Sequence, residues 1–376
     1  MISNIANISL LFLIVFFIVS AIVTWVAGIT LTKTTDSLDT RFKIGDALGG
    51  LILLGISGSL PEIAITYSAA RDGHIPIIIG NLLGGIAMQT LIIVIFDFAV
   101  DKKRPLSYLA GSPILSLETI FAIVLTIIAL LATLIPAKDT FFKTNPLSIV
   151  LVAGWVIGLY LINKFRNKSQ LHRTAPDASP GRKHHERRAV ENHIFYAKKS
   201  NLQVILFFLV ASIATLAAGV VLEESGSAIA DRLGINSGIF AATVLALMSS
   251  LPEISTGLES IFIGDNHLAI SDIMGGNAFM LIIFLFADLV AAKPILSYAG
   301  HLDILFAVLG IAMMGVYAVS FILRPKRCYF RLGFDSVLQI VLYALGLLAL
   351  YYIHCLFSQV LCAAAAGPDG GVLFRL

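Results

Sequence analysis

The chain has 376 residues, of which 58% are hydrophobic and 13% are charged, and its formal net charge is +3 at pH 7. Soluble domains contain about 25% charged residues, so this composition excludes an ordinary soluble protein. The small net charge also gives no reason to expect a nucleic-acid partner. The three cysteines, Cys328, Cys355 and Cys362, show no paired spacing, so they predict neither a disulfide framework nor a zinc site.

The apolar residues form long runs without charges, and most runs approach the roughly 20 residues that a helix needs to cross a bilayer. We therefore predict an all-α membrane protein with ten transmembrane helices. The first five are expected at 5–31, 44–70, 75–100, 112–136 and 146–163, and the second five at 201–222, 237–262, 267–291, 296–323 and 334–357.

A polar segment rich in lysine and arginine, residues 164–200, separates the two sets of spans. It divides the chain into residues 1–163, the polar loop and residues 201–362. The tail, 363–376, has the texture of a vector-derived remnant and is left out of the fold. Short loops rich in Lys and Arg stay in the cytoplasm, so the polar loop is predicted inside and both termini outside. The loop has no room for a regulatory domain, which favours a prokaryotic plasma membrane.

A short motif occurs once in each half. Residues 59–63 (SLPEI) recur as residues 250–254, 191 positions later, and matching glycines and an aspartate extend the similarity to Asp97 and Asp288, within repeats of about 50–99 and 241–290. Five spans separate the copies, and because five is odd the copies must cross the membrane in opposite directions. Inverted repeats are typical of secondary transporters, so we predict two inverted five-helix repeats.

The motif places a carboxylate, Glu62 or Glu253, in the middle of a span, where a charge costs about 2.5–3.5 kcal/mol. The proline before it, Pro61 or Pro252, removes a backbone donor and breaks the helix. The break leaves bare carbonyls beside serine hydroxyls and the carboxylate. Because Ca²⁺ takes roughly six to eight such hard oxygens, we predict a cation site where the two glutamates meet at the bilayer midplane. The alternative is a structural hydrogen bond between two protonated acids.

The next span in each half adds polar and small residues. Positions 19, 23 and 27 after each glutamate are four apart, so they share one face of a helix. These positions are Asn81, Gly85 and Gln89 in the first half, and Asp272, Gly276 and Met280 in the second. Asp272 would be a third carboxylate near the pair, and the glycine pairs at 84–85 and 275–276 would let a neighbouring helix approach closely.

Four further acidic residues lie near the ends of spans. Asp97 and Asp288 occupy matching positions in the repeat, and we interpret both as helix ends at the water interface. Glu118 and Asp303 stand in weaker contexts, which fit either an interfacial position or a path that leads to the site.

The repeated pattern resembles the alpha repeats of the cation/calcium exchanger superfamily, which includes the sodium/calcium exchangers. In such exchangers two glutamates bind calcium and compete for sodium or protons, a role that the resemblance assigns to Glu62 and Glu253. It also implies a carbonyl ligand four residues before each glutamate, a hydroxyl ligand three residues before it, and polar ligands on the following span. The full set of metal-site residues expected in this chain is Glu62, Glu253, Ser59, Ser250, Gly58, Ser249, Asp272, Asn81, Gln89 and Asn277.

The chain departs from the sodium/calcium exchanger pattern at several of these positions. Gly85 and Gly276 stand where such exchangers have serines that help to bind sodium, so sodium coupling does not carry over with the resemblance. Met280 stands at the second-half carboxylate or amide of the pattern, whereas Gln89 keeps an amide on a longer side chain. Asp272 replaces the usual asparagine and would restore a charge one turn away.

These observations predict a secondary antiporter that exchanges Ca²⁺ for Na⁺ or H⁺ by alternating access, with no enzyme activity and no cofactor. Its expected partners are inorganic cations and the lipid bilayer, and neither a nucleic acid nor a nucleotide. Three alternatives stay open: a proton-coupled exchanger of another cation, a passive channel or structural membrane protein, and an intramembrane serine protease of the rhomboid type. The protease reading rests on the short pattern G-x-S-G at residues 55–58, and the histidines lie near span ends rather than within a span.

Overall fold

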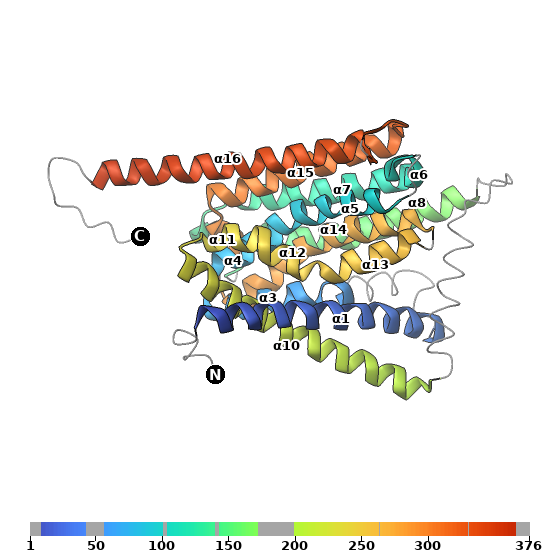
Figure 1. The fold of residues 1–376 in the computed structure, drawn as a ribbon, viewed down its shortest axis with the longest axis horizontal. Coiled ribbons are helices and arrows are strands. Elements are labelled where there is room, and N and C mark those ends of the chain that lie inside the picture. Colours follow the sequence, from blue (N-terminus) through green and yellow to red (C-terminus); the bar gives the residue numbers. More distant parts are fainter. Residues whose placement is uncertain are drawn as a thin grey trace.

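The structure, a computed structural model, describes residues 9–42, 56–100, 104–139, 143–171, 199–262, 264–329 and 331–365. Most of these residues are helical, and the long helices run side by side along one axis (Figure 1). In the first half the elements are α1 (Leu10–Phe42), α3 (Leu60–Asp72), α4 (Ile75–Ile79), η3 (Gly80–Gly84), α5 (Gly85–Ala99), α6 (Leu106–Ala110), α7 (Pro113–Ala132), η4 (Ala137–Asp139) and α8 (Pro146–Leu171). In the second half they are α10 (Asn201–Leu233), α11 (Ser237–Phe240), η5 (Ala241–Leu245), α12 (Ala246–Ser249), α13 (Leu251–Phe262), α14 (Asn266–Ala291), η6 (Ile295–Tyr298), α15 (His301–Leu323), β1 (Cys328–Tyr329), β2 (Leu332–Gly333) and α16 (Phe334–Ala365).

Seven helices of the described residues are long and apolar enough to cross a membrane, and the bent pair Ser237–Ser249 and Leu251–Phe262 would make an eighth. This number supports a multi-pass membrane protein but does not confirm the predicted count of ten. Two predicted spans account for the difference. The span at 44–70 lies partly outside the described residues, and beyond Leu350 most side chains of the last helix lie outside them too, so only its stretch Phe334–Leu350 was assessed.

α1 and α10 extend well past their predicted ends at 31 and 222, so those two boundaries were wrong. The prediction ended each span at its first charged residue, Lys33 or Glu223. In the structure Lys33 Nζ lies 3.7 Å from Glu259 Oε1, and Glu223 accepts a hydrogen bond of 2.7 Å from Ser68 Oγ. Polar partners on neighbouring helices therefore allow both helices to continue beyond their apolar stretch.

Both predicted proline breaks are present. A short helical stretch at 56–58 ends just before α3, which has Pro61 in its first turn. In the second half α12 ends at Ser249 and α13 begins at Leu251, with a bend of 46° between the two helical arms. Each glutamate of the motif therefore lies in the first turn of a new helix, where the helix dipole favours a negative charge.

Two π-helical segments, η3 and η5, contact one another, and neither was predicted. Glycines permit this approach: a Cβ on Gly84 would lie 2.1 Å from the Ala242 Cβ, and a Cβ on Gly80 would lie 2.3 Å from the Gly238 carbonyl oxygen. The predicted packing role of Gly84 is therefore confirmed, whereas a Cβ on Gly275 would meet nothing within 4 Å. Such π segments are rare and frequently lie at functional sites.

Equivalent helices of the two halves make matching contacts. α1 packs along α10 at one edge of the bundle (Figure 1), α1 also contacts α13, and α10 contacts α3. Gly28 of α1 lies against Pro252, where an added Cβ would be 2.6 Å from the proline ring. Gly219 of α10, 191 positions after Gly28, lies against Ala64 at the same distance. The two helices therefore cross the proline-broken helices at corresponding points.

The all-α prediction misses one small feature. β1 and β2 form a two-stranded antiparallel ladder in which Cys328 lies opposite Gly333. The turn between them includes Arg331 at φ 73°. Strands of two residues are too short to leave an alternating pattern in a sequence, which is why they were not predicted.

Asp97 and Asp288 connect the two halves. The Asp97 carboxylate accepts hydrogen bonds of 2.6 Å from the backbone N–H groups of Leu106, in its own half, and Gly333, in β2 just before the last helix. Asp288 makes the equivalent pair of bonds, at 2.7 and 2.9 Å, to the segment after its own helix and to the start of α8. Both side chains are buried, at 3% and 0% exposure, so the interpretation that they face water was wrong.

We predict that Asp97→Asn lowers the free energy of unfolding by about 1–3 kcal/mol, because the new amide would point a donor at a backbone N–H group. The measurement is thermal unfolding of the purified protein in detergent. Asp231→Asn, which alters an exposed aspartate at the end of α10, is the matched control and should leave Tm nearly unchanged. A Tm for Asp97→Asn equal to that of the wild type would show that these bonds contribute little.

His74 lies in the short connection between α3 and α4, and its side chain links this connection to α10. Its Nδ1 lies 2.8 Å from Glu223 Oε1, and Ser68 Oγ holds the other carboxylate oxygen at 2.7 Å. Glu223 is fully buried, whereas the His74 side chain is 40% exposed. The hydrogen bond to Glu223 raises the pKa of His74 above its usual value of 6.5; partial burial opposes the shift, and the charges of Asp72 and Asp231 add to it.

Since the folded protein binds the His74 proton more tightly than the unfolded chain does, this contact stabilises the fold fully below about pH 6.5, and the gain is lost as the pH rises through the raised pKa. We therefore expect His74→Gln to lower Tm more at about pH 5.5 than at about pH 8.5. Ser68→Ala removes a bond to the same carboxylate but no titrating imidazole, so it should lower Tm similarly at both pH values. Equal losses for His74→Gln at the two pH values would contradict this account.

Candidate functional site

Glu62 and Glu253, one from each half, come together inside the bundle. Glu62 is fully buried, and no described residue lies in hydrogen-bond geometry with either of its carboxylate oxygens; Oε2 of Glu253 also lacks a described partner. The two carboxylates lie close enough for their charges to interact, and the Ser249 side chain is the near neighbour of Glu62 from the other half. Because a buried charge without a counter-charge is costly, the pair calls for a cation or for protons.

The serines at the breaks keep hydroxyl oxygens available. Ser249 and Ser250 donate to the Ala246 carbonyl at 3.1 and 2.8 Å, so their hydroxyl hydrogens are used within their own helix and their lone pairs stay free to accept. Ser59, which matches Ser250, is buried at the start of α3. At Gly58, the expected carbonyl ligand, an added Cβ would meet nothing within 4 Å. The first break therefore borders open space rather than packed side chains.

Three predicted amide residues are buried with unpaired polar atoms. Asn81 on η3 lacks partners for both Oδ1 and Nδ2, Gln89 on α5 for Oε1, and Asn277 on α14 for Oδ1. The Asn277 Nδ2 donates to Thr90 Oγ1 at 3.1 Å, so its oxygen is the free end. These helices contact one another, and α5 and α14 contact the helices of the two glutamates. Since each unsatisfied buried polar group costs about 1–3 kcal/mol, their concentration here favours a bound ligand.

Gln89 on α5 and Met280 on α14 occupy matching positions. Each side chain lies next to a glycine of the other helix, Gln89 next to Gly276 and Met280 next to Gly85. A Cβ on Gly276 would lie 3.4 Å from Gln89 Oε1, and a Cβ on Gly85 would lie 2.5 Å from Met280 Cε. One side of the site therefore presents an amide oxygen and the other a methyl group, although the backbones correspond.

Asp272 lies near Glu253, close enough for their charges to interact, and Thr256 Oγ1 lies 3.3 Å from its Oδ2. Glu118 is bonded elsewhere, because it accepts a hydrogen bond of 2.7 Å from Ser271 Oγ. Within the described part of the chain, no group of three or more His, Cys, Asp and Glu side chains is placed to hold a metal ion. A cation at the two glutamates would therefore also need amide, hydroxyl or carbonyl oxygens, which the neighbouring helices supply.

Three threonines escaped the sequence prediction. Thr24 on α1, Thr66 on α3 and Thr215 on α10 are fully buried, and within the described ranges none of their hydroxyl groups has a hydrogen-bond partner. Thr66 follows Glu62 by four residues and so shares its helix face, a spacing that could have identified it. Thr24 and Thr215 are 191 positions apart, which is the offset of the repeat, but they lie outside the repeated motif.

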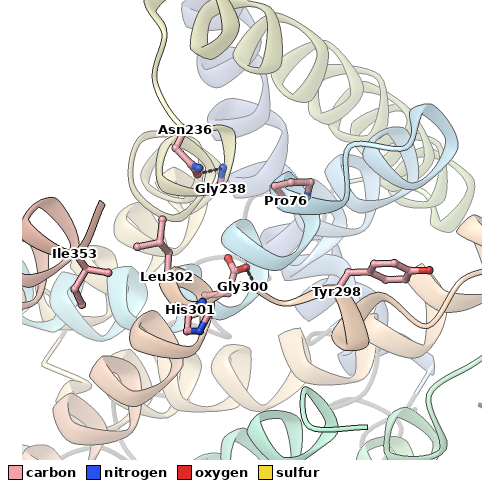
Figure 2. Close-up of a pocket in the computed structure, with 9 residues that line it drawn as sticks. Pro76, Asn236, Gly238, Tyr298, Gly300, His301, Leu302 and Ile353 are labelled. Carbon is pink, nitrogen blue, oxygen red and sulfur yellow. Dashed lines mark hydrogen bonds between the residues drawn. The ribbon is translucent and has the colours of Figure 1, made fainter. Parts of the chain in front are cut away.

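The cavity in Figure 2 is separate from this site. It has a volume of about 290 Å³ and lies where α4, α11 and α15 begin. Its polar lining includes Asn236, His301 and Asp303, and the Asp303 carboxylate accepts a hydrogen bond of 2.8 Å from the Gly300 N–H. None of the predicted cation ligands is among the residues that line it.

Comparison with known proteins identifies relatives over most of the chain. A family model described as sodium/calcium exchanger protein matches residues 12–165 and 203–360. The putative antiporter CaxA of Alkalimonas amylolytica is 22% identical over 264 residues, which cover 70% of this chain and 76% of that protein.

Two solved structures have a similar fold. A crystal structure of the H⁺/Ca²⁺ exchanger CAX matches with a TM-score of 0.57 and 16% identity, over 90% of this chain and 88% of that one. A structure of the sodium-calcium exchanger NCX_Mj matches with a TM-score of 0.50 and 16% identity, over 90% of this chain and 99% of that one. At this identity the two likenesses show a shared fold.

Proposed function

Because the chain belongs to the sodium/calcium exchanger protein family, we propose that it is a secondary antiporter that exchanges Ca²⁺ for a second cation across a membrane. The observation that carries the proposal is the meeting of Glu62 and Glu253, where three buried carboxylate oxygens have no hydrogen-bond partner among the described residues. Two carboxylates balance the charge of Ca²⁺, and the adjacent amides and the broken helices provide further oxygens toward the roughly six to eight that it takes. The names of the relatives, an antiporter and exchangers of Ca²⁺, agree with this assignment.

We further propose ten spans arranged as two inverted repeats, with both termini outside a prokaryotic plasma membrane. The support lies in paired contacts that follow the 191-residue offset. α1 meets α13 where α10 meets α3, and Asp97 and Asp288 make equivalent bonds to the opposite half. A repeat of this kind brings matched residues to one axis, as it does for the two glutamates.

Alternating access follows from the charge of the site. When empty and ionised, two buried carboxylates oppose closure of the surrounding helices, because water would be removed from both charges. A bound cation or protons neutralise them and permit the occluded state. Movement of α1 and α10, with the broken helices that they cross, against the remaining bundle would then expose the site to the other side.

We predict that Glu62→Gln lowers Ca²⁺ exchange at least about tenfold, because the loss of one carboxylate–cation contact costs about 1.4 kcal/mol or more. The measurement is counter-ion-driven ⁴⁵Ca²⁺ uptake into proteoliposomes. Glu224→Gln, which alters a carboxylate of α10 that pairs with Arg71 at 3.4 Å, is the control and should transport as the wild type does. Normal uptake by Glu62→Gln would rule out the site.

The Met280 side chain favours protons over Na⁺ as the coupling ion. Its Cε occupies the space next to Gly85, so this corner of the site offers a methyl group where a coupling cation such as Na⁺ would need an oxygen. A proton needs no such ligand, because it binds to a carboxylate oxygen itself. The unpaired oxygens of Glu62 and Glu253 are therefore sufficient to carry the counter-ion.

We accordingly expect a pH gradient to drive ⁴⁵Ca²⁺ uptake in the complete absence of Na⁺, and a Na⁺ gradient at equal pH to drive none above background. Uptake under both gradients, measured on the same proteoliposome preparation, would separate the two couplings. Uptake driven by the Na⁺ gradient alone would refute proton coupling but leave the exchanger proposal intact. Uptake without any counter-ion gradient or exchangeable ion on the far side would instead indicate a channel.

The protease alternative gains no support from the serine of its pattern. Ser57 is buried and accepts a hydrogen bond of 3.1 Å from Thr35 Oγ1. A serine nucleophile needs an adjacent general base, and a threonine hydroxyl that donates to it cannot act as one.

A further inference from the structure

Thr24 and Thr215 are a matched pair outside the predicted site. They are separated by the repeat offset of 191 residues, and they are fully buried on α1 and α10. Neither hydroxyl group has a hydrogen-bond partner in the part of the chain that the structure describes. Threonines in the helices of this protein usually donate to the carbonyl four residues earlier. Thr30, Thr34, Thr90 and Thr126 all do so, at 2.7–2.9 Å. The two unpaired hydroxyls are therefore exceptions to the local rule, and they occur at equivalent positions.

The cost of such an arrangement indicates a missing partner. A buried hydroxyl group without a hydrogen bond costs about 1–3 kcal/mol, and valine would fill the same volume without that cost. The described part of the protein supplies no partner for either group, so a ligand that enters the bundle is the partner we consider.

The positions of the two residues show where that partner would lie. Gly28 is one turn after Thr24 on the same helix face and touches the Pro252 ring. Gly219 is one turn after Thr215, and a Cβ added to it would lie 3.1 Å from the Pro61 carbonyl oxygen. α1 runs in the same direction as α13, and α10 in the same direction as α3 (Figure 1). Each threonine therefore lies toward the residues just before the proline, which is where each helix is broken.

We propose that Thr24 on α1 and Thr215 on α10 supply oxygen ligands to the transported cation. This inference rests on the proposed exchange function. The breaks and the glutamates belong to α3, α12 and α13, so the threonines would be the contribution of a separate pair of helices. A cation bound between them draws α1 and α10 onto both breaks. Occupancy of the site is in this way linked to the position of the helices that the exchange cycle moves.

The test compares Thr24→Val and Thr215→Val, which remove the hydroxyl but keep the shape, with Thr24→Ser and Thr215→Ser, which keep the hydroxyl. Terbium bound to the purified protein is the probe, and the decay of its luminescence in H₂O and D₂O counts the waters on the ion. Each valine variant should add about one water to bound Tb³⁺, since water replaces a lost ligand. The Ca²⁺ concentration for half-maximal exchange should rise about tenfold, as expected for one lost ligand contact.

Thr126→Val is the matched control, because the Thr126 hydroxyl is buried and bonded to Ala122 on α7; it should change neither readout. Without cation, both valine variants should unfold at or above the wild-type Tm, since they remove an unpaired hydroxyl. An unchanged water count, or equal losses in the valine and serine variants, would overturn the proposal. Failure of wild-type exchange would defeat the proposed function, yet the water count on Tb³⁺ would still decide the role of the two threonines.

Discussion

Two carboxylates that meet inside an apolar helix bundle, with three of their oxygens unpaired among the described residues, are the constraint on which the rest of this structure depends. The free energy that such a pair requires is large in a low-dielectric interior unless an ion or protons neutralise it. The surrounding features all reduce that cost when a cation is present. The proline breaks place Glu62 and Glu253 in first helical turns, and buried amides such as Asn81 have polar atoms with no partner among the described residues.

The two halves have equivalent backbones, but several matching positions carry different side chains. Gln89 and Met280 cross to matching glycines but present an amide oxygen and a methyl group. At one end of α10, Glu223 is buried against His74, whereas the matching region of α1 carries the partly exposed pair of Lys33 and Glu259. The two halves therefore share a backbone plan but present different side chains at matching positions.

Much of the site could be predicted because its chemistry is local in the sequence. A proline followed by a glutamate within an apolar run is costly in a membrane, and its repetition at one offset favours a shared functional role over a structural one. The two breaks, the burial of the glutamates and their meeting all follow from that motif. Whether Asn81, Gln89 and Asn277 bind a cation stays a prediction, to which the structure adds that each has an unpaired buried atom.

The remaining features depend on contacts between distant segments, which a single sequence does not display. Asp97 looked like a helix end in water, but its partner Gly333 lies in the other half of the chain. The extension of α1 past Lys33 depends on Glu259 of another helix. The π segments arise where Gly84 and Ala242 pack together, and no local propensity marks either position. Thr24 and Thr215 became visible once the structure showed that their hydroxyl groups have no partner.

The most direct test of the central claim is an anomalous difference map of crystals soaked in Sr²⁺, which replaces Ca²⁺ and scatters anomalously. The account predicts a peak between the carboxyl groups of Glu62 and Glu253, which disappears in the Glu62→Gln, Glu253→Gln double variant. Strong Sr²⁺ density elsewhere in the molecule, with none between the two glutamates, would contradict it.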